Sequence, residues 1–326
     1  MSEDKKMFLS VRNLVVEYTS SGEVIHAVNG VSFDLEQGKT LGLVGETGAG
    51  KTSIAKAIMR ILPDPPAKIR EGEILLEGDD IMKMQEKDML KIRGNKITMI
   101  FQDPMTALNP VMTVGQQIAE GIMLHNAVSK GEARTRAIKM LEMVGITEER
   151  YDEYPFQFSG GMKQRVVIAM ALACNPRLLL ADEPTTALDV TIQAQVLEMI
   201  SELKERLNTS MILITHDLGV VAEMCDNVAI IYAGEIVEYG SKRDIFKNPK
   251  HPYTLGLFRS LPSLVDDEPR LHPIDGMPPD PSALPQGCLF SPRCPHATDA
   301  CRQHEIPQTE VSPGHYCRCI KTEQED

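Results

Sequence analysis

The sequence predicts an α/β fold whose core is a largely parallel sheet covered by helices. Short apolar runs, the length of buried strands, alternate with longer segments whose apolar residues recur at helical spacing. The glycine-rich octet Gly45–Thr52 stands between one such run and one such segment. Alternating strands and helices are typical of a layered α/β core, so the octet is expected at a strand–turn–helix junction within it.

The predicted elements can be placed in order along the chain. Strands are expected where β-branched and other apolar residues gather, at residues 8–18, 24–28, 39–44, 74–76, 97–101, 178–181, 211–214, 228–232 and 235–239. The first two and the last two of these strands form hairpins, the last pair around Ala233-Gly234. Helices are expected from their periodicity at residues 51–62, 113–124, 130–144, 162–174 and 190–207.

The composition changes after about Lys247, where prolines multiply, periodicity fades and cysteines gather. We therefore expect two domains, a core at 1–247 and a small irregular C-terminal module at 248–326. The stretch from about 104 to 174 reads as helices alone, which indicates a helical subdomain inserted into the core. No internal repeats are found in the sequence.

Charge and hydropathy exclude several classes of protein. The formal net charge of the 326 residues is −12, which argues against nucleic acid as a main partner because phosphate binding needs a basic surface. No stretch is long and apolar enough to cross a bilayer. The first residues, Met1–Met7, lack the apolar run of a secretory signal. We therefore expect a cytosolic chain whose role at a membrane depends on a partner.

The octet matches the phosphate-loop pattern G-x-x-x-x-G-K-[ST] in full. Glycines let successive backbone N–H groups point at phosphate oxygens, and the helix that follows adds its positive end. Lys51 would neutralise the β- and γ-phosphates, and the Thr52 hydroxyl would bind Mg²⁺. The residues expected to bind a nucleotide here are Gly45, Glu46, Thr47, Gly48, Ala49, Gly50, Lys51, Thr52 and Ser53.

Two adjacent carboxylates follow the apolar run at 178–181. Asp182 and Glu183 stand where that strand ends, and ligands of α/β sheets bind at the carboxyl ends of strands. Asp182 can hold Mg²⁺, while Glu183 can accept a proton from an attacking water. An acidic turn after a strand is common, but together with the phosphate loop the pair favours nucleotide hydrolysis.

A further segment, Phe158–Arg165, resembles the signature motif of ATP-binding-cassette (ABC) ATPases, a pattern close to L-S-G-G-Q from which Phe158 and Met162 depart mildly. The resemblance covers about residues 8 to 239. In the order of that family, Tyr18 resembles the adenine-stacking aromatic, Gln102 the Q-loop glutamine, Ala187-Leu188-Asp189 the D-loop and His216 the switch histidine.

The resemblance implies an ABC ATPase core of the P-loop NTPase class, with an antiparallel β subdomain and the helical insert. Ser159, Gly160 and Gly161 would form a second anion site, for the ATP held by an opposite subunit. Gln102 would reach Mg²⁺ or the water, and His216 would bond the γ-phosphate. Asp189 would face the partner, although it could also cap the helix that follows it.

Beyond the core, His251–Leu255 and Ser260–Pro262 resemble the extension of oligopeptide and dipeptide importer ATPases. In that branch, the ligands implied for a [4Fe–4S] cluster are Cys288, Cys294, Cys301 and Cys319. The chemistry of four thiolates suits either such a cluster or a tetrahedral Zn²⁺, and free thiols are the plain alternative. Cys317 competes with Cys319 as the fourth ligand because both flank Arg318.

The leading interpretation is an ATPase that powers the import of di- or oligopeptides and lies peripherally on the cytoplasmic face of the cell membrane. Its expected cofactors are ATP, Mg²⁺ and the cluster. Its expected partners are a second, different ABC ATPase subunit, two transmembrane permease subunits and, indirectly, an extracytoplasmic peptide-binding protein.

Three alternatives stay open at this point. The chain could serve an importer of another solute, such as nickel or a sugar, because substrate choice lies in other subunits. It could be a non-transport ABC ATPase, but those commonly carry two cassettes or long coiled coils, and this sequence has one phosphate loop and no long heptad run. It could be an iron–sulfur redox or sensor protein, which the intact nucleotide motifs disfavour.

Overall fold

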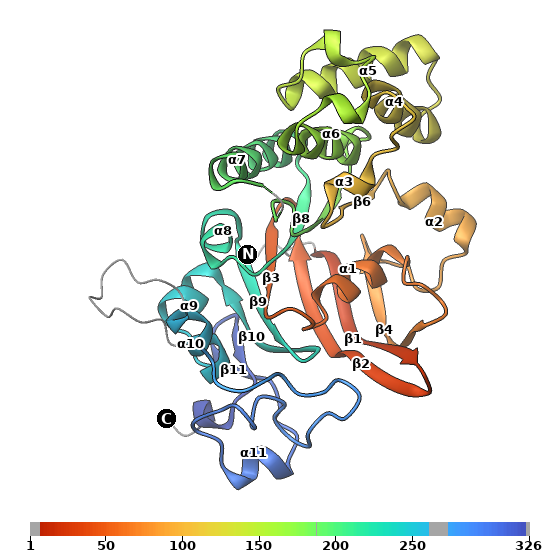
Figure 1. The fold of residues 1–326 in the computed structure, drawn as a ribbon. Helices are drawn as coiled ribbons and strands as arrows, with labels where there is room; N and C mark the ends of the chain where they lie inside the picture. Colours follow the sequence, from red (N-terminus) through yellow and green to blue (C-terminus); the bar gives the residue numbers. More distant parts are fainter. Residues whose placement is uncertain (1–6, 187, 261–272, 324–326) are drawn as a thin grey trace, which may run out of the picture. The chain divides into compact units, whose positions relative to one another are not determined.

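The computed structural model describes residues 7–186, 188–260 and 273–323, which fall into two units. The helical unit is formed around Asp34–Thr40 and Leu75–Thr215. The P-loop unit is formed around Ser10–Phe33, Leu41–Ile74 and the described residues from His216 onward. Figure 1 labels most of the helices and strands of both units.

Three parallel strands form the sheet of the helical unit: β6 (Ile97–Ile100), β7 (Leu178–Asp182) and β8 (Ser210–Thr215). β7 pairs with β6 on one side and with β8 on the other, with Leu178 opposite both Ile97 and Ser210. Every residue of the three strands is buried. This explains why their sequences are continuous apolar runs, since parallel strands are covered on both faces.

Helices make up most of the remaining helical unit. They are α2 (Glu86–Ile92), α3 (Pro104–Ala107), α4 (Val114–His125), α5 (Lys130–Met143), α6 (Gly160–Leu172) and α7 (Val190–Leu207), with 3-10 turns at Glu148–Arg150 and Pro155–Gln157. The last two residues of β4 (Ala67–Leu76) pair here with the short strand β5 (Asp79–Asp80).

The predicted helices of this unit are confirmed to within two residues at each end. Side chains explain two of the starts, because Thr113 accepts a hydrogen bond from the Gln116 N–H and Ser129 accepts one from the Glu132 N–H. In Figure 1, α4, α5 and α6 lie together, coloured from ochre to green. The seven-residue helix α2 was not predicted, because so short a segment shows little periodicity.

An antiparallel sheet opens the P-loop unit, with the strand order β2-β1-β4. It contains β1 (Met7–Ser20), β2 (Glu23–Glu36) and the greater part of β4. Ser21 and Gly22, between β1 and β2, both have positive φ values of 52° and 88°, as a tight hairpin turn requires. The predicted N-terminal hairpin is thus confirmed, with longer strands than the sequence indicated.

The second sheet of this unit contains β3 (Thr40–Val44), which runs parallel to β9 (Asn227–Tyr232). β10 (Glu235–Ser241) returns antiparallel to β9 through a turn at Ala233 and Gly234, which confirms the predicted second hairpin. The helices are α1 (Lys51–Met59), α8 (Leu218–Met224) and α9 (Lys242–Lys247). α1 ends before its predicted limit because Arg60 adopts a left-handed conformation with φ of 50°.

The C-terminal segment is less irregular than predicted. It contains α10 (Pro252–Arg259), α11 (Asp299–Gln303), β11 (Thr309–Ser312), β12 (His315–Cys317) and a 3-10 turn at Ile320–Glu323. β12 pairs antiparallel with β10, and β11 adds to β12. Strands this short carry too little sequence pattern to be recognised, and the sheet edge that they join exists only after folding.

A buried carboxylate binds this segment to the sheet. Glu238 on β10 is 0% exposed, and it accepts hydrogen bonds from the backbone N–H groups of Lys250 at 2.7 Å and of His251 at 2.9 Å. The Nε2 atom of His315 on β12 lies 2.8 Å from the same carboxylate. Two separate pieces of chain are therefore bound to β10 through one side chain.

We expect Glu238→Ala to lower the free energy of unfolding by about 3 kcal/mol, because it leaves buried donors without an acceptor. Urea denaturation followed by circular dichroism measures this change. Glu202→Ala, at an exposed position of α7, is the control and should stay within about 0.5 kcal/mol of the unaltered chain. Equal losses for the two variants would contradict the structural role of Glu238.

Candidate functional site

The glycine-rich octet forms a tight loop between β3 and α1. A Cβ atom on Gly45 would come 2.1 Å from the carbonyl oxygen of Ile231, and one on Gly50 would come 2.2 Å from that of Ala27. Gly50 also has a φ of 99°. Only glycine fits at these two positions, because the loop runs directly against the backbones of β2 and β9. α1 then presents its N-terminal N–H groups to the concave side of the loop.

Lys51 folds back over this loop. Its Nζ atom donates hydrogen bonds to the carbonyl oxygens of Gly45 at 2.7 Å and Glu46 at 2.9 Å, and the residue is 7% exposed. Thr52 and Ser53 follow in the first turn of α1. A cation held over a glycine-rich loop at the start of a helix is suited to bind a chain of phosphates.

Two other predicted residues belong to the same unit. The Tyr18 hydroxyl lies 3.0 Å from Oγ of Ser53, so the tyrosine stands beside the first turn of α1. His216 directly follows β8 and is exposed. Asp217 then caps α8 through its carboxylate. His216 is therefore held between the end of a buried strand and the start of a capped helix.

The helical unit brings Gln102 and Glu183 together. The Gln102 side-chain amide donates to Oε2 of Glu183 at 2.9 Å, and the Thr186 hydroxyl donates to the same oxygen at 2.9 Å. Glu183 has a φ of 46°, an uncommon value for a residue other than glycine, while the preceding Asp182 is only 3% exposed. The predicted acid pair thus stands at the carboxyl end of β7, with the glutamate oriented by two donors.

The signature segment starts α6. Ser159 is its N-cap and accepts a hydrogen bond from the Met162 N–H, and both Ser159 and Gly160 are exposed. A Cβ atom on Gly161 would come 2.8 Å from the Ile192 side chain of α7, which favours glycine there. These residues present an exposed helix N-terminus, the kind of structure that binds an anion.

Buried contacts join α6 to the turn that carries Glu183. Gln164 on α6 is 0% exposed, and its side-chain amide donates to the carbonyl oxygen of Pro184. Asp189 occupies the N-cap position of α7 but makes no capping hydrogen bond, and it is exposed. Of the predicted D-loop, Ala187 lies outside the described residues. The catalytic and binding roles assigned to all these residues from the sequence stay predictions.

Four of the five C-terminal cysteines line one cavity: Cys288, Cys294, Cys301 and Cys319. The backbone N–H of Cys288 donates to the Cys301 carbonyl oxygen at 2.8 Å. Burial, reinforced by the neighbouring thiols, raises the pKa of Cys288 to about 11. Cys317 does not line this cavity and is 0% exposed on β12. The structure thus groups the four cysteines that the sequence predicted and separates the fifth.

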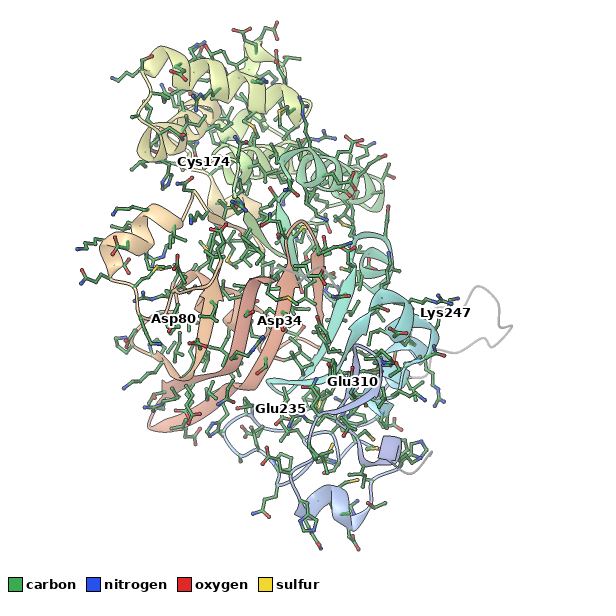
Figure 2. All side chains as sticks on the ribbon, turned by 180° about the vertical axis from the view of Figure 1, so that it is seen from behind. Asp34, Asp80, Cys174, Glu235, Lys247 and Glu310 are labelled. Atoms are coloured by element: carbon green, nitrogen blue, oxygen red, sulfur yellow. The ribbon has the colours of Figure 1, made fainter. Side chains whose placement is uncertain are left out.

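A metal-binding module is nevertheless not shown. Within the described parts of the chain, no three His, Cys, Asp or Glu side chains are grouped so that they could hold a metal ion. The two isolated cysteines are also accounted for by packing. Cys174, labelled in Figure 2, belongs to the helical unit, where its thiol lies 3.6 Å from the Gly121 carbonyl oxygen of α4. Cys225 is buried beside β3, where its sulfur would lie 2.9 Å from a Cβ atom on Gly42.

Sequence reasoning gave no role to two residues that contact the phosphate loop. The Arg293 guanidinium forms a two-pronged ion pair with the Glu46 carboxylate, and the Tyr253 hydroxyl accepts a hydrogen bond from the Glu46 backbone N–H at 3.0 Å. Tyr253 lies in His251–Leu255, which the resemblance had singled out, and Arg293 directly precedes Cys294, one of the cysteines named for the cluster. An arginine directly before Cys294 was the signal that could have indicated a charged partner.

Comparisons with known proteins agree with this arrangement. Residues 28–186 match the family described as "ABC transporter", and residues 237–301 match "Oligopeptide/dipeptide transporter, C-terminal region". The dipeptide transport ATP-binding protein DppD of Bacillus subtilis (strain 168) is 51% identical over 97% of this chain and 95% of its own length. This chain belongs to the ABC transporter family.

As an ABC family member, the chain is also 47% identical to the oligopeptide transport ATP-binding protein OppD of Escherichia coli (strain K12), over 97% of this chain and 94% of that protein. A solved dimeric, post-hydrolysis structure of the ATP-binding cassette MJ0796 with ADP and Pi matches it with a TM-score of 0.65 and 28% identity, covering 72% of this chain and 99% of that one. The predicted ABC ATPase fold and enzyme class are therefore confirmed.

No helix in the described residues of this ABC ATPase is long and apolar enough to cross a membrane. This agrees with the absence of a long apolar run in the sequence.

We expect Gly50→Ala to raise the Kd for a fluorescent ATP analogue at least about tenfold, because the new methyl group collides with the Ala27 carbonyl and displaces the loop. Gly22→Ala is the matched control. Gly22 has a similar φ of 88° but no atom within 4 Å of a Cβ position, so nucleotide affinity should not change. Equal Kd values for the two variants would show that the close approach at Gly50 is unimportant.

Proposed function

We propose that this chain is the ATP-hydrolysing subunit of an importer for dipeptides and oligopeptides. The observation that carries the proposal is the presence, in one chain, of a full set of ABC ATP-site motifs and a C-terminal region of the oligopeptide/dipeptide transporter type at 237–301. The relatives named above, which align over nearly their whole length, are described as dipeptide and oligopeptide transport proteins. ATP binding would bring two cassettes together, and hydrolysis would let them part.

In this proposal Glu183 is the general base of hydrolysis. The water oxygen forms a bond to the γ-phosphorus while a water proton passes to the Glu183 carboxylate. The bond from the γ-phosphorus to the bridging oxygen breaks, and ADP leaves with its electron pair. Gln102 donates to that carboxylate and orients it. His216 would donate a hydrogen bond to the γ-phosphate as charge develops there.

The remaining residues bind the nucleotide. Lys51, already placed over the phosphate loop, would exchange its loop carbonyl partners for β- and γ-phosphate oxygens. Thr52, Gln102 and Asp182 are the oxygen donors that would hold Mg²⁺, which neutralises charge on the phosphates when it is bound. Tyr18, beside the first turn of α1, would offer its ring to the adenine.

We propose that the working complex contains a second, different ABC ATPase subunit. Ser159 and Gly160 are exposed at the start of α6, as a contact to the ATP of another subunit requires. Asp189, exposed and without a capping bond, would face the same partner. Two transmembrane permease subunits would receive the motion and an extracytoplasmic peptide-binding protein would deliver the substrate. The chain would then lie peripherally on the cytoplasmic face of the membrane.

We also propose that Cys288, Cys294, Cys301 and Cys319 hold a [4Fe–4S] cluster. They line one cavity, which supports Cys319 over Cys317 as the fourth ligand. A tetrahedral Zn²⁺ held by the same four thiolates is the alternative. In a four-iron cluster each of the four thiolates would bind a different iron.

We expect Glu183→Gln to retain ATP binding and to lower ATP turnover at least about tenfold, because the amide keeps the shape of the side chain but cannot accept the proton. ATPase activity and peptide uptake should be measured in the reconstituted transporter, with nucleotide affinity measured in parallel. Glu198→Gln, exposed on α7, is the control and should leave both unchanged. Unchanged turnover in Glu183→Gln would remove Glu183 from the base role, and intact ATPase activity without peptide uptake would contradict the substrate class.

Anaerobically purified protein should contain about four irons and four sulfides per chain, with a broad brown absorbance. Cys319→Ser should lose most of this iron, because it removes a ligand. Cys317→Ser, the matched control two positions away, should retain it. One zinc per chain and no colour would contradict the cluster, and iron loss in Cys317→Ser alone would reassign the fourth ligand.

A further inference from the structure

We propose that Arg293, in the C-terminal segment, is a positioning residue for ATP binding: it neutralises Glu46 inside the phosphate loop and holds the loop in its binding shape. This inference rests on the proposed ATPase function and adds a residue that the ABC motifs do not include. Arg293 and Glu46 are 247 positions apart in the sequence. Their contact therefore links two distant parts of the P-loop unit.

The ion pair has the geometry of a strong one. The two terminal nitrogens of Arg293 donate to the two carboxylate oxygens of Glu46 at 2.8 and 3.1 Å. The Arg293 side chain is 5% exposed and that of Glu46 is 29% exposed, so water screens the pair only in part. Bidentate arginine–carboxylate ion pairs, with two parallel hydrogen bonds, are stronger and more directional than pairs with one hydrogen bond.

The arginine is itself fixed in place. Its Nε atom donates to the Asp275 carbonyl oxygen at 3.0 Å, and a terminal nitrogen donates to the Ile274 carbonyl oxygen at 3.3 Å. The guanidinium also lies 5.8 Å from the ring centre of Tyr232 and donates to its hydroxyl at 3.4 Å. Burial alone lowers the pKa of Arg293, but the bonds to Glu46 and Tyr232 outweigh it and raise the pKa, so the charge is permanent.

The backbone of Glu46 is held from the same side. Its N–H donates to the Tyr253 hydroxyl, and Tyr253 packs against Tyr232 and Phe290 with ring centres 4.7 and 5.4 Å away. Tyr253 is 0% exposed. Glu46 is therefore held at two points by residues from outside the phosphate loop. Tyr253, part of an aromatic cluster, binds its main chain, and Arg293 binds its side chain.

Glu46 in turn contacts Lys51, the lysine proposed to bind the phosphates. The Glu46 carbonyl oxygen accepts one of the hydrogen bonds from Lys51 Nζ, at 2.9 Å. Glu46 is also a negative charge in a loop built to hold the negative charges of ATP, and without Arg293 it would repel them. Arg293 therefore acts on ATP through Glu46 and not by touching the nucleotide.

The test is a set of variants in the full chain, purified anaerobically and assayed with a fluorescent ATP analogue. We expect Arg293→Met to raise the Kd about tenfold, because it leaves Glu46 unpaired and charged. Arg293→Lys should show a smaller loss, since lysine keeps the charge without the two-pronged geometry. Arg243→Met, an exposed arginine on α9, is the matched control and should bind like the unaltered chain.

The decisive variant is the double substitution Glu46→Gln with Arg293→Met. Removing the unpaired charge should restore most of the affinity lost in Arg293→Met, and raising the salt concentration should shrink the defect of that single variant. A purely structural role would instead lower the unfolding temperature of both variants and show no rescue. Rescue supports the proposal, whereas an unchanged Kd in Arg293→Met, or a double variant no better than it, overturns it.

The outcomes also separate this inference from the function on which it rests. Failure of the unaltered chain to bind the ATP analogue would overturn the proposed ATPase function. Normal binding by the unaltered chain with normal binding by Arg293→Met would overturn only the role of Arg293. In the reconstituted transporter, the same variant should raise the KM for ATP more than it lowers kcat.

Discussion

The P-loop unit depends on how closely the phosphate loop can approach the backbones around it. Two carbonyl oxygens, from Ala27 on β2 and Ile231 on β9, stand where Cβ atoms of Gly50 and Gly45 would be. The Gly234 N–H also donates to the Ala49 carbonyl oxygen at 3.0 Å. A loop this tightly enclosed can keep its shape without a ligand, which lowers the cost of ordering the loop on binding.

In the helical unit, hydrogen bonds hold the backbone around Glu183 in place. The unusual φ angle of Glu183 is tolerated because hydrogen bonds on both sides fix the backbone there. The Glu183 N–H donates to the Ile214 carbonyl oxygen at 2.9 Å, and the side-chain amide of the buried Gln164 donates to the carbonyl oxygen of the next residue, Pro184. Gln164 lies on the helix that Ser159 caps. The turn that carries the proposed base and the helix that carries the signature motif therefore share a buried hydrogen bond, so neither can shift alone without leaving a polar group unpaired.

The C-terminal segment acts on the core through polar contacts as well as packing. Glu238 on β10 forms hydrogen bonds with β12 and with the start of α10, and Arg293 forms an ion pair with Glu46 of the phosphate loop. The cavity lined by four cysteines has His251 and Phe290 in its wall as well. Glu235 of β10 and Glu310 of β11, both labelled in Figure 2, mark the sheet that this segment extends. The module that the sequence predicted as small and irregular thus contacts the phosphate loop directly.

The sequence by itself determined the features that are local in the chain: the buried parallel strands, the long helices, the glycine-rich loop and the order of the ABC motifs. Each of these features depends on the spacing of apolar residues or on a short motif, such as a glycine that the backbone conformation requires, and both can be recognised in a local stretch of sequence. Only the tertiary structure decided that Gln102 meets Glu183, that Cys319 and not Cys317 lines the cysteine cavity, that β12 joins β10, and that Arg293 pairs with Glu46. These contacts join residues far apart in the chain, and their partners are selected by packing and by the need to satisfy buried charge, which no local pattern records.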